Sequence, residues 1–407
     1  MAFSVSVSRL TLALSDAVDL VGVDVVQHGK RVALLATECG RELGWGEARV
    51  RTLCLAALLH DCGVSSTHVH RQLVDTFDWE GSDEHCERGH DLLGDVELFR
   101  PLAEIVRHHH TPWPVLTASA LAPDTALMSN ALFLADRVDA FIHQQGENNP
   151  LTASRGVIQA MEQRAETSFA PELVAAFRAV AHRQATWFTL EPHHLERHLA
   201  GLMAPLDERP VPFEELRAIA DVFSRVVDFK SPYTEEHSRG VARVARLLGS
   251  LAGLAERDCE LLEVAGLLHD LGKLRVPDEV LDKGGPLTRA EGATMARHPF
   301  ETYQILGRLS SIPELASWAG LHHEALDGSG YPFNLRADRL PLPARVVAVA
   351  DVVQALAQDR PYRPPLTARK IVRQLRHLGR TGKLDPTLVE LVVAHKEACL
   401  AAATVAA

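Results

Sequence analysis

The two halves of the chain repeat one spacing of histidines. Nearly equal intervals separate the members of two series, which are His28, His60, His85 and His108 in the first half and His237, His269, His298 and His322 in the second. The first interval is 32 residues in both series, and the strings AALLHD and AGLLHD surround His60 and His269. Such self-similarity predicts two copies of one structural unit in tandem.

The sequence between these histidines predicts an all-α fold. Aromatic residues make up 5% of the chain, and apolar residues recur at helical spacing in segments such as Glu47 to Leu59 and Phe213 to Phe229. The same spacing predicts one helix from about Ser15 to Leu43. Three prolines, at positions 205, 210 and 212, interrupt the helical pattern. We therefore expect an N-terminal domain at residues 1–204, a linker at 205–212 and a C-terminal domain at 213–407.

Composition narrows the class of protein. The 407 residues are 46% hydrophobic and 23% charged, which is typical of globular domains. A net charge of -11 argues against a nucleic-acid polymer as partner, because such partners require a basic face. The six cysteines form no CxxC pair, and no signal peptide or membrane-spanning run is evident. These features predict a cytoplasmic protein with reduced thiols and no membrane contact.

The repeated polar residues of the second half predict a metal centre. Their side chains supply seven nitrogen and oxygen ligands, more than one metal ion needs, from His237, His269, Asp270, His298, His322, His323 and Asp351. This number suits two divalent ions with Asp270 as a bridge. Because no thiol is present in the set, iron or manganese is favoured over a cysteine-rich zinc site.

Cationic residues near this set predict a phosphate ester as substrate. Lys273, Arg360 and Arg363 can hold phosphate oxygens, although a solvated surface role is an open alternative for all three. Tyr331 can cover a base or sugar if its turn, DGSGYP, borders the site. We expect the chemistry to centre on His269, Asp270 and Lys273.

These motifs resemble those of the HD-GYP phosphodiesterase domain, a variant of the HD phosphohydrolase superfamily. The resemblance covers about residues 213 to 400 and includes HDLGK at His269, HHE at His322, DGSGYP at Asp327 and RPYR at Arg360. It implies an all-helical fold, the ligand set above and hydrolysis of a 3′,5′-cyclic dinucleotide. Cyclic di-GMP is the first candidate and cyclic GMP-AMP the second. Tyr233 replaces a glutamate that helps some family members bind a third metal, so two metals are expected.

The first half resembles an HD domain without the GYP features. By the repeat, a second metal site is formed by His28, His60, Asp61, His85, His108, His109 and Asp136. Val64 occupies the position of Lys273, and His110 to Trp113 replaces the GYP turn. We therefore predict a domain that binds metal but is regulatory or differently specific.

Two other functions remain open on sequence alone. The chain can be a catalytically weak receptor that binds the dinucleotide and signals through protein partners or as a homodimer, with the GYP turn as an exposed contact. It can also hydrolyse other small phosphate esters, with the first copy as the active site.

Overall fold

The helices of this computed structural model divide into two packing units. One unit is Ser6–Arg209, and the other is Pro210–Ala407 together with Met1–Val5. The structure describes residues 2–3, 5–22, 27–64, 66–76, 81–145, 149–204, 210–230, 236–358 and 365–404. Within these ranges the all-α prediction is confirmed, since the sheet found there is a single pair of two-residue strands.

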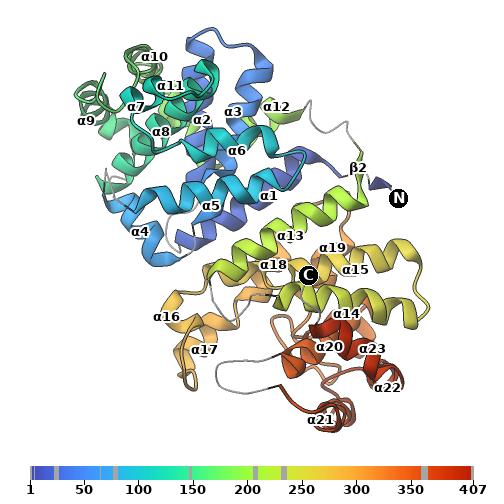
Figure 1. Ribbon diagram of the computed structural model, residues 1–407. Coiled ribbons are helices and arrows are strands. Elements are labelled where there is room, and N and C mark those ends of the chain that lie inside the picture. The colour runs from blue at the N-terminus through green and yellow to red at the C-terminus, as the bar shows by residue number, and fades with distance from the viewer. Residues whose placement is uncertain are drawn as a thin grey trace. The chain divides into compact units, whose positions relative to one another are not determined.

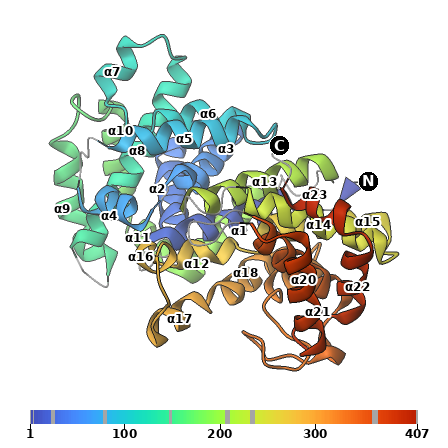
Figure 2. The same cartoon turned by 60° about the horizontal axis from the view of Figure 1, so that its bottom comes forward.

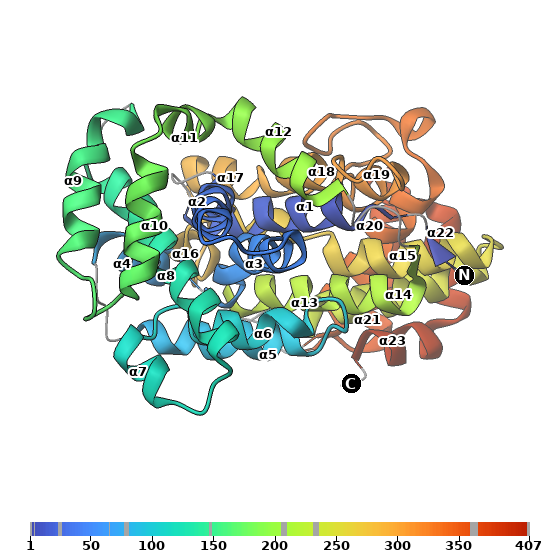
Figure 3. The same ribbon diagram turned by 90° about the horizontal axis from the view of Figure 1, so that it is seen from above.

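The Ser6–Arg209 unit is built around a pair of adjacent helices, α2 and α3 (Figure 3). Helix α8 packs against α2, and α5 packs against α6 (Figure 1). Its helices are α1 Val7–Asp19, α2 His28–Glu42, α3 Glu47–Leu59, α4 Thr67–Asp75, α5 Ser82–Gly94, α6 Arg100–Arg107, α7 Trp113–Ala118, α8 Pro123–Gln144, α9 Pro150–Glu162, α10 Pro171–Ala181, α11 Gln184–Thr189 and α12 Pro192–Met203, with the 3-10 turns η1 Leu20–Gly22 and η2 His60–Gly63.

The second unit repeats this arrangement with α14 against α15 and α20 against α14. Near the C-terminal end of this unit, helices α20, α21 and α22 pack together (Figure 2). Its elements are β1 Ala2–Phe3, β2 Val211–Pro212, α13 Phe213–Lys230, α14 His237–Leu251, α15 Glu256–Leu268, η4 Leu271–Arg275, α16 Asp278–Leu281, α17 Arg289–Met295, α18 His298–Leu306, α19 Glu314–Gly320, η5 Ala337–Arg339, α20 Leu342–Ala357, α21 Ala368–Arg380, α22 Pro386–Ala394 and α23 Lys396–Thr404.

The first residues of the chain pack with the second unit. Strand β1 pairs antiparallel with β2, and the ring of Phe3 lies 6.4 Å from that of Phe213. The domain boundaries expected from the prolines, 1–204 and 213–407, stay a prediction. Residues 205–209 of the expected linker lie outside the described part of the chain.

Each unit starts its first site helix in the same unusual way. Gln27 and Glu236 adopt left-handed backbone conformations, with φ of 68° and 67°, and each directly precedes a histidine that begins a helix. Non-glycine residues rarely adopt this conformation. It typically occurs at functional sites, where the backbone must direct a side chain. The predicted single helix from Ser15 to Leu43 is therefore wrong, because α1 ends at Asp19 and α2 begins at His28.

The second histidine of each unit lies in a tight turn after a buried helix. Helices α3 and α15 end at Leu59 and Leu268, and the HD pair lies within a 3-10 turn in the first unit and directly before one in the second. A Cβ on Gly63 would lie 2.0 Å from the carbonyl oxygen of His85, and one on Gly272 would lie 2.1 Å from that of His298. Only glycine permits this close approach, which brings the third histidine against the HD turn.

Membrane insertion by a helix is not supported in the described ranges, because none of the helices there combines the length and apolar character that spanning a bilayer demands.

Candidate metal centres

Five elements of the second unit bring the predicted residues of that half together. His237 begins α14, His269 and Asp270 follow α15, His298 begins α18, His322 and His323 follow α19, and Asp351 lies in α20. The four histidines His237, His269, His298 and His322 are each at most 3% exposed, as is Asp270. Burying this many polar side chains in one place requires that they satisfy one another or bind an ion.

The carboxylate of Asp270 lies between two groups of histidines. Its Oδ2 atom is 3.6 Å from Nε2 of His237 and 3.2 Å from Nε2 of His269. Its Oδ1 atom faces the other way, 3.4 Å from Nε2 of His298 and 3.9 Å from Nε2 of His322. A carboxylate with one oxygen toward each group has the geometry of a bridging ligand.

The ligand atoms on either side of Asp270 are close enough to share an ion. Within each of two groups the donor atoms lie no more than 4.8 Å apart, and these groups are His237 with His269 and Asp351, and His298 with His322 and His323. Asp351 also lies 3.4 Å from His237, through Oδ1 and Nε2. The residues present therefore form two adjacent clusters that could each hold a metal.

The hydrogen bonds of the histidines favour metal coordination. Nδ1 of His269, His298 and His322 each donates to a backbone carbonyl three residues earlier, at 2.7, 2.8 and 2.6 Å. This bond fixes the tautomer and leaves the Nε2 lone pair directed into the centre. Nε2 of His269 is buried and makes no hydrogen bond. An acceptor atom left in this state fits a bound cation.

Burial keeps most of these imidazoles neutral. Desolvation lowers the pKa of His298 to about 3 and that of His322 well below its usual value. Burial would raise the pKa of Asp270, but His269 and Lys273 outweigh it and hold the pKa well below the usual range. His298 and His322 are therefore neutral beside an ionised carboxylate, which are the protonation states that a divalent metal requires.

Of the four predicted substrate contacts, two lie beside the centre and two lie outside the described residues. Nζ of Lys273 lies 2.6 Å from Oδ2 of Asp270, at the edge of the centre. The ring of Tyr331 lies 4.9 Å from that of His323 at an angle of 31°. The GYP turn therefore borders the site, which is the condition on which the role of Tyr331 depended. Arg360 and Arg363 lie outside the described residues.

Sequence reasoning missed the residue that anchors this turn. Glu324 is 5% exposed, and its two carboxylate oxygens accept from the backbone amides of Phe333 and Leu335 at 2.7 and 2.8 Å. A Cβ on Gly330 would lie 2.3 Å from the amide nitrogen of Ala325. The third residue of HHE was a signal, since a buried glutamate needs backbone donors.

Thr302 connects two of the elements that carry these ligands. Its hydroxyl donates to the carbonyl of His269 at 3.0 Å and accepts from the amide of Gly272 at 2.9 Å. Helix α18, which carries His298, is thereby tied to the HD turn.

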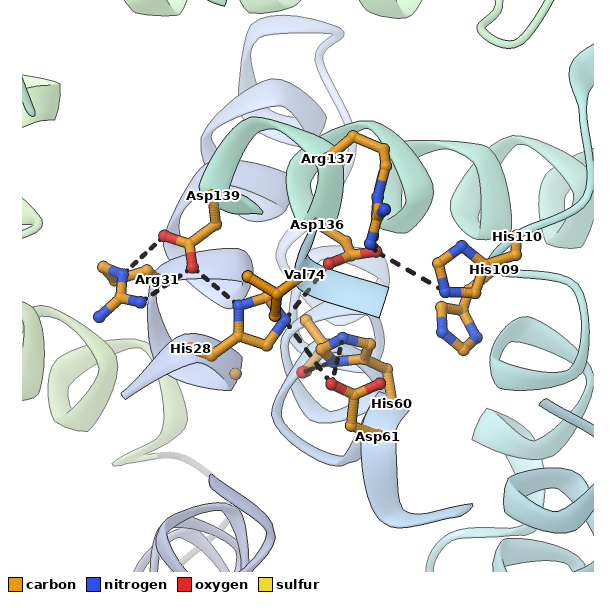
Figure 4. Close-up of polar contacts among 12 residues, drawn as sticks. His28, Arg31, His60, Asp61, Val74, His109, His110, Asp136, Arg137 and Asp139 are labelled. Atoms are coloured by element: carbon orange, nitrogen blue, oxygen red, sulfur yellow. Dashed lines mark hydrogen bonds and ion pairs between the residues drawn. The ribbon is translucent and has the colours of Figure 1, made fainter. Parts of the chain in front are cut away.

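The first unit contains a similar centre (Figure 4). Oδ2 of Asp61 lies 3.6 Å from His28 and 3.4 Å from His60, and Oδ1 lies 3.7 Å from His85, in each case to Nε2. Asp136 lies 3.3 Å from Nε2 of His28 through Oδ1. As in the other half, Nε2 of His60 is buried without a hydrogen bond. This donor set also fits a metal.

The histidine pair of this centre is shifted by one residue from the predicted register. His109 and His110 point inward, and Nε2 of His109 lies 3.2 Å from that of His85. His108 instead lies 3.6 Å from Glu104 and contacts Thr111. Helix α6 ends at Arg107, so the next residue caps the helix on its outer side. His109 is the counterpart of His322, since each lies 24 residues after the third histidine.

Two arginines distinguish the first centre from the second. Arg31 donates to both oxygens of Asp139, which accepts from Nδ1 of His28 at 2.7 Å. Arg137 contacts Oδ2 of Asp136 at 2.8 Å (Figure 4). The positions that match these arginines in the second unit hold Gly240 and Val352. Gln354 stands at the position of Asp139, and its amide oxygen accepts from Nδ1 of His237. These arginines were missed because the sequence shows them as ordinary helix residues.

Comparisons with known proteins agree with this organisation. Two matches to models described as HD domain cover residues 25–141 and 221–388. A 3′3′-cGAMP-specific phosphodiesterase of Vibrio cholerae is 32% identical over 97% of this chain and 93% of its own length. The cyclic di-GMP phosphodiesterase response regulator RpfG of Xanthomonas campestris is 35% identical over 49% of this chain and 51% of its own.

A solved structure shares the fold of the whole chain. It is a cyclic GMP-AMP-specific phosphodiesterase of V. cholerae, with a TM-score of 0.68 at 24% identity over 98% of both chains. Together with the two HD pairs and the Gly330-Tyr331-Pro332 turn, these matches show that the chain belongs to the HD-GYP phosphodiesterase family and carries two HD domains in tandem.

Proposed function

We propose that the chain is a metal-dependent phosphodiesterase that hydrolyses a 3′,5′-cyclic dinucleotide in the HD domain of its second half. The observation that carries this proposal is the position of Asp270, with one carboxylate oxygen toward His237 and His269 and the other toward His298 and His322. Such a centre suits two divalent ions, for which iron or manganese fits a ligand set without thiols.

When bound, the metal ions would supply a coordinated water of lowered pKa and positive charge beside the phosphate. The residues of the chain do the remaining work. The ammonium of Lys273 lies at the edge of the centre, where it can donate to a phosphate oxygen. The ring of Tyr331, beside His323, can stack on a base next to the scissile phosphate. Backbone carbonyls fix the tautomers of His269, His298 and His322, so these three imidazoles need not change tautomer to bind a metal.

The comparisons support a mixed guanine-adenine substrate. Sequence motifs alone placed cyclic di-GMP first. The V. cholerae relative that spans nearly the whole chain is named as specific for 3′3′-cGAMP, whereas RpfG, named for cyclic di-GMP, matches about half of it. We therefore propose 3′3′-cGAMP as the first substrate to test and cyclic di-GMP as the second.

For the first half, we propose a domain that binds metal and regulates the enzyme or has a different specificity. Val64 is buried where the second half has Lys273, and Arg137 already neutralises Asp136. With valine at this position, the first centre lacks the phosphate contact that we propose for Lys273. We also retain the predictions of a cytoplasmic location, of no nucleic-acid polymer as partner and of homodimer or signalling contacts.

Product chromatography with the full chain tests this proposal. The protein is loaded anaerobically with Fe²⁺ or Mn²⁺ and incubated with each cyclic dinucleotide and with a panel of small phosphate esters. The proposal expects linear dinucleotide or mononucleotide from at least one cyclic substrate. Tight binding without turnover would instead support a receptor, and turnover of simple esters alone would support a different phosphohydrolase.

A further inference from the structure

Four metal-binding side chains gather in one half of the first centre. They come from α5 and from the end of α6, and they are His85, Cys86, His109 and His110. Their donor atoms all lie within 4.8 Å of one another. His85 is 1%, Cys86 2% and His109 0% exposed. The three imidazole rings are mutual neighbours, with centroids 4.3 to 5.1 Å apart.

Two of the distances within this group match those between ligands of a tetrahedral zinc ion. Zn–N and Zn–S bonds place two nitrogen ligands about 3.4 Å apart and a nitrogen and a sulfur about 3.6 Å apart at the tetrahedral angle. In the structure, Nε2 of His85 lies 3.2 Å from Nε2 of His109 and 3.7 Å from Sγ of Cys86. His109 directs Nε2 inward because its Nδ1 donates to the carbonyl of Val106 at 2.5 Å.

The thiol is specific to this half of the chain. His85 corresponds to His298, so Cys86 corresponds to Pro299, which has no donor atom. In the described part of the second unit, the group at this place is His298, His322 and His323, which contains no thiol. The two halves therefore differ at this position in the number and the chemical softness of their ligands.

We propose that His85, Cys86, His109 and His110 bind a zinc ion that the second half cannot bind in the same way. Thiolate with imidazole selects zinc over the harder ions that suit histidine and carboxylate. The thiol proton is released to solvent as the Zn–S bond forms. Four protein ligands fill a tetrahedral shell, so this ion has no open position for a water.

A closed site of this kind stabilises a fold and does not hydrolyse a substrate. It would join α5 to the end of α6, two elements that already pack together. Its role would be structural or regulatory, in keeping with the absence of a lysine at Val64. The inference rests on the proposal that the first half holds metal, and it is independent of the phosphodiesterase activity of the second half.

Cobalt substitution of the full chain tests the thiolate directly. Co²⁺ bound to sulfur gives a near-ultraviolet charge-transfer band that nitrogen and oxygen ligands do not give. The wild type is compared with Cys86→Ser, Cys86→Ala and the control Cys54→Ser, which changes a buried thiol in α3. We expect the band, and one equivalent of zinc by elemental analysis, in the wild type and Cys54→Ser, and the loss of both in the two Cys86 variants.

Further variants separate the ways in which this inference can fail. His298→Ala should keep the band, since it alters the other half. If His85→Ala loses zinc but Cys86→Ser keeps it, the first half holds metal and the thiolate assignment is wrong. If neither variant changes the zinc content or the cobalt spectrum, the first half holds no such ion. Neither result bears on hydrolysis by the second half, which is measured separately.

Discussion

Lys273 donates from Nζ to Oδ2 of Asp270 across 2.6 Å. The same oxygen faces His237 and His269, so it is also the atom that a metal at that cluster would use. Asp270 cannot give this oxygen fully to both, so a metal bound there would free the ammonium of Lys273 for a phosphate. On the proposed function, the lysine, which is replaced by Val64 in the first half, would connect metal loading with substrate binding.

Replacing Lys273 by methionine should remove a phosphate contact without emptying the centre. We expect kcat/KM for the cyclic dinucleotide to fall about 100-fold, as for the loss of one charged donor to a transition state. Metal content should stay at the wild-type level. The control Lys283→Met breaks the pair with Glu291, 2.5 Å away at the surface, and should change the rate about twofold at most. Unchanged kinetics in Lys273→Met would contradict the role given to this lysine.

The GYP turn should be intolerant of a methyl group at Gly330. An added Cβ would lie 2.3 Å from the nitrogen of Ala325, so the turn must shift and carry Tyr331 away from His323. Gly330→Ala should raise KM by about tenfold or more, which corresponds to roughly 1.4 kcal/mol of lost binding. Gly292→Ala is the matched control, because its Cβ would meet no atom within 4 Å. Equal KM values for the two variants would show that the turn does not contact substrate.

The first centre should depend on Asp139 in a way that the second does not. Asp139 holds His28 and is itself held by Arg31. Asp139→Asn keeps the shape but weakens both bonds, and losing such a supporting partner typically lowers metal affinity about 10- to 100-fold. Competition with a chelator should show this loss for one class of metal site, with the sites of the second half as internal reference. Equal loss from both halves would indicate general unfolding.

Lys230 should make stability increase with pH in the alkaline range. Burial lowers its pKa from 10.5 to about 8, despite the nearby Asp278. Between these values the unfolded chain binds the proton more tightly, so the free energy of unfolding rises with pH by up to about 3 kcal/mol. Lys230→Met should remove this rise, which urea denaturation at a series of pH values can measure. Parallel curves for the two proteins would refute the assignment.

The repeat predicted much of the fold and the site because both depend on local sequence. Helix α3 has the predicted bounds, Glu47 to Leu59, and the HD turns follow buried helices in both halves. The break between α1 and α2 was missed because the left-handed conformation of Gln27 is not encoded by a glycine. Apolar periodicity continues across such a break.

The register of the histidine pair was missed for a similar reason. Three consecutive histidines follow Arg107, and only the helix end decides which two face inward. Partners from distant segments, such as Arg31 with Asp139, depend on packing that spacing alone does not determine. Cys86 was set aside because cysteines were judged by CxxC spacing, whereas two of its partners, His109 and His110, come from another helix end.

The most direct test compares His269→Ala with His60→Ala in the full, metal-loaded chain. Both replace the histidine of an HD pair, and each histidine is buried in its own unit. The measurement is the initial rate of 3′3′-cGAMP and cyclic di-GMP hydrolysis, with metal content determined on the same samples. We predict that His269→Ala abolishes hydrolysis, whereas His60→Ala retains turnover and loses metal from the first half. Full activity in His269→Ala would contradict the account.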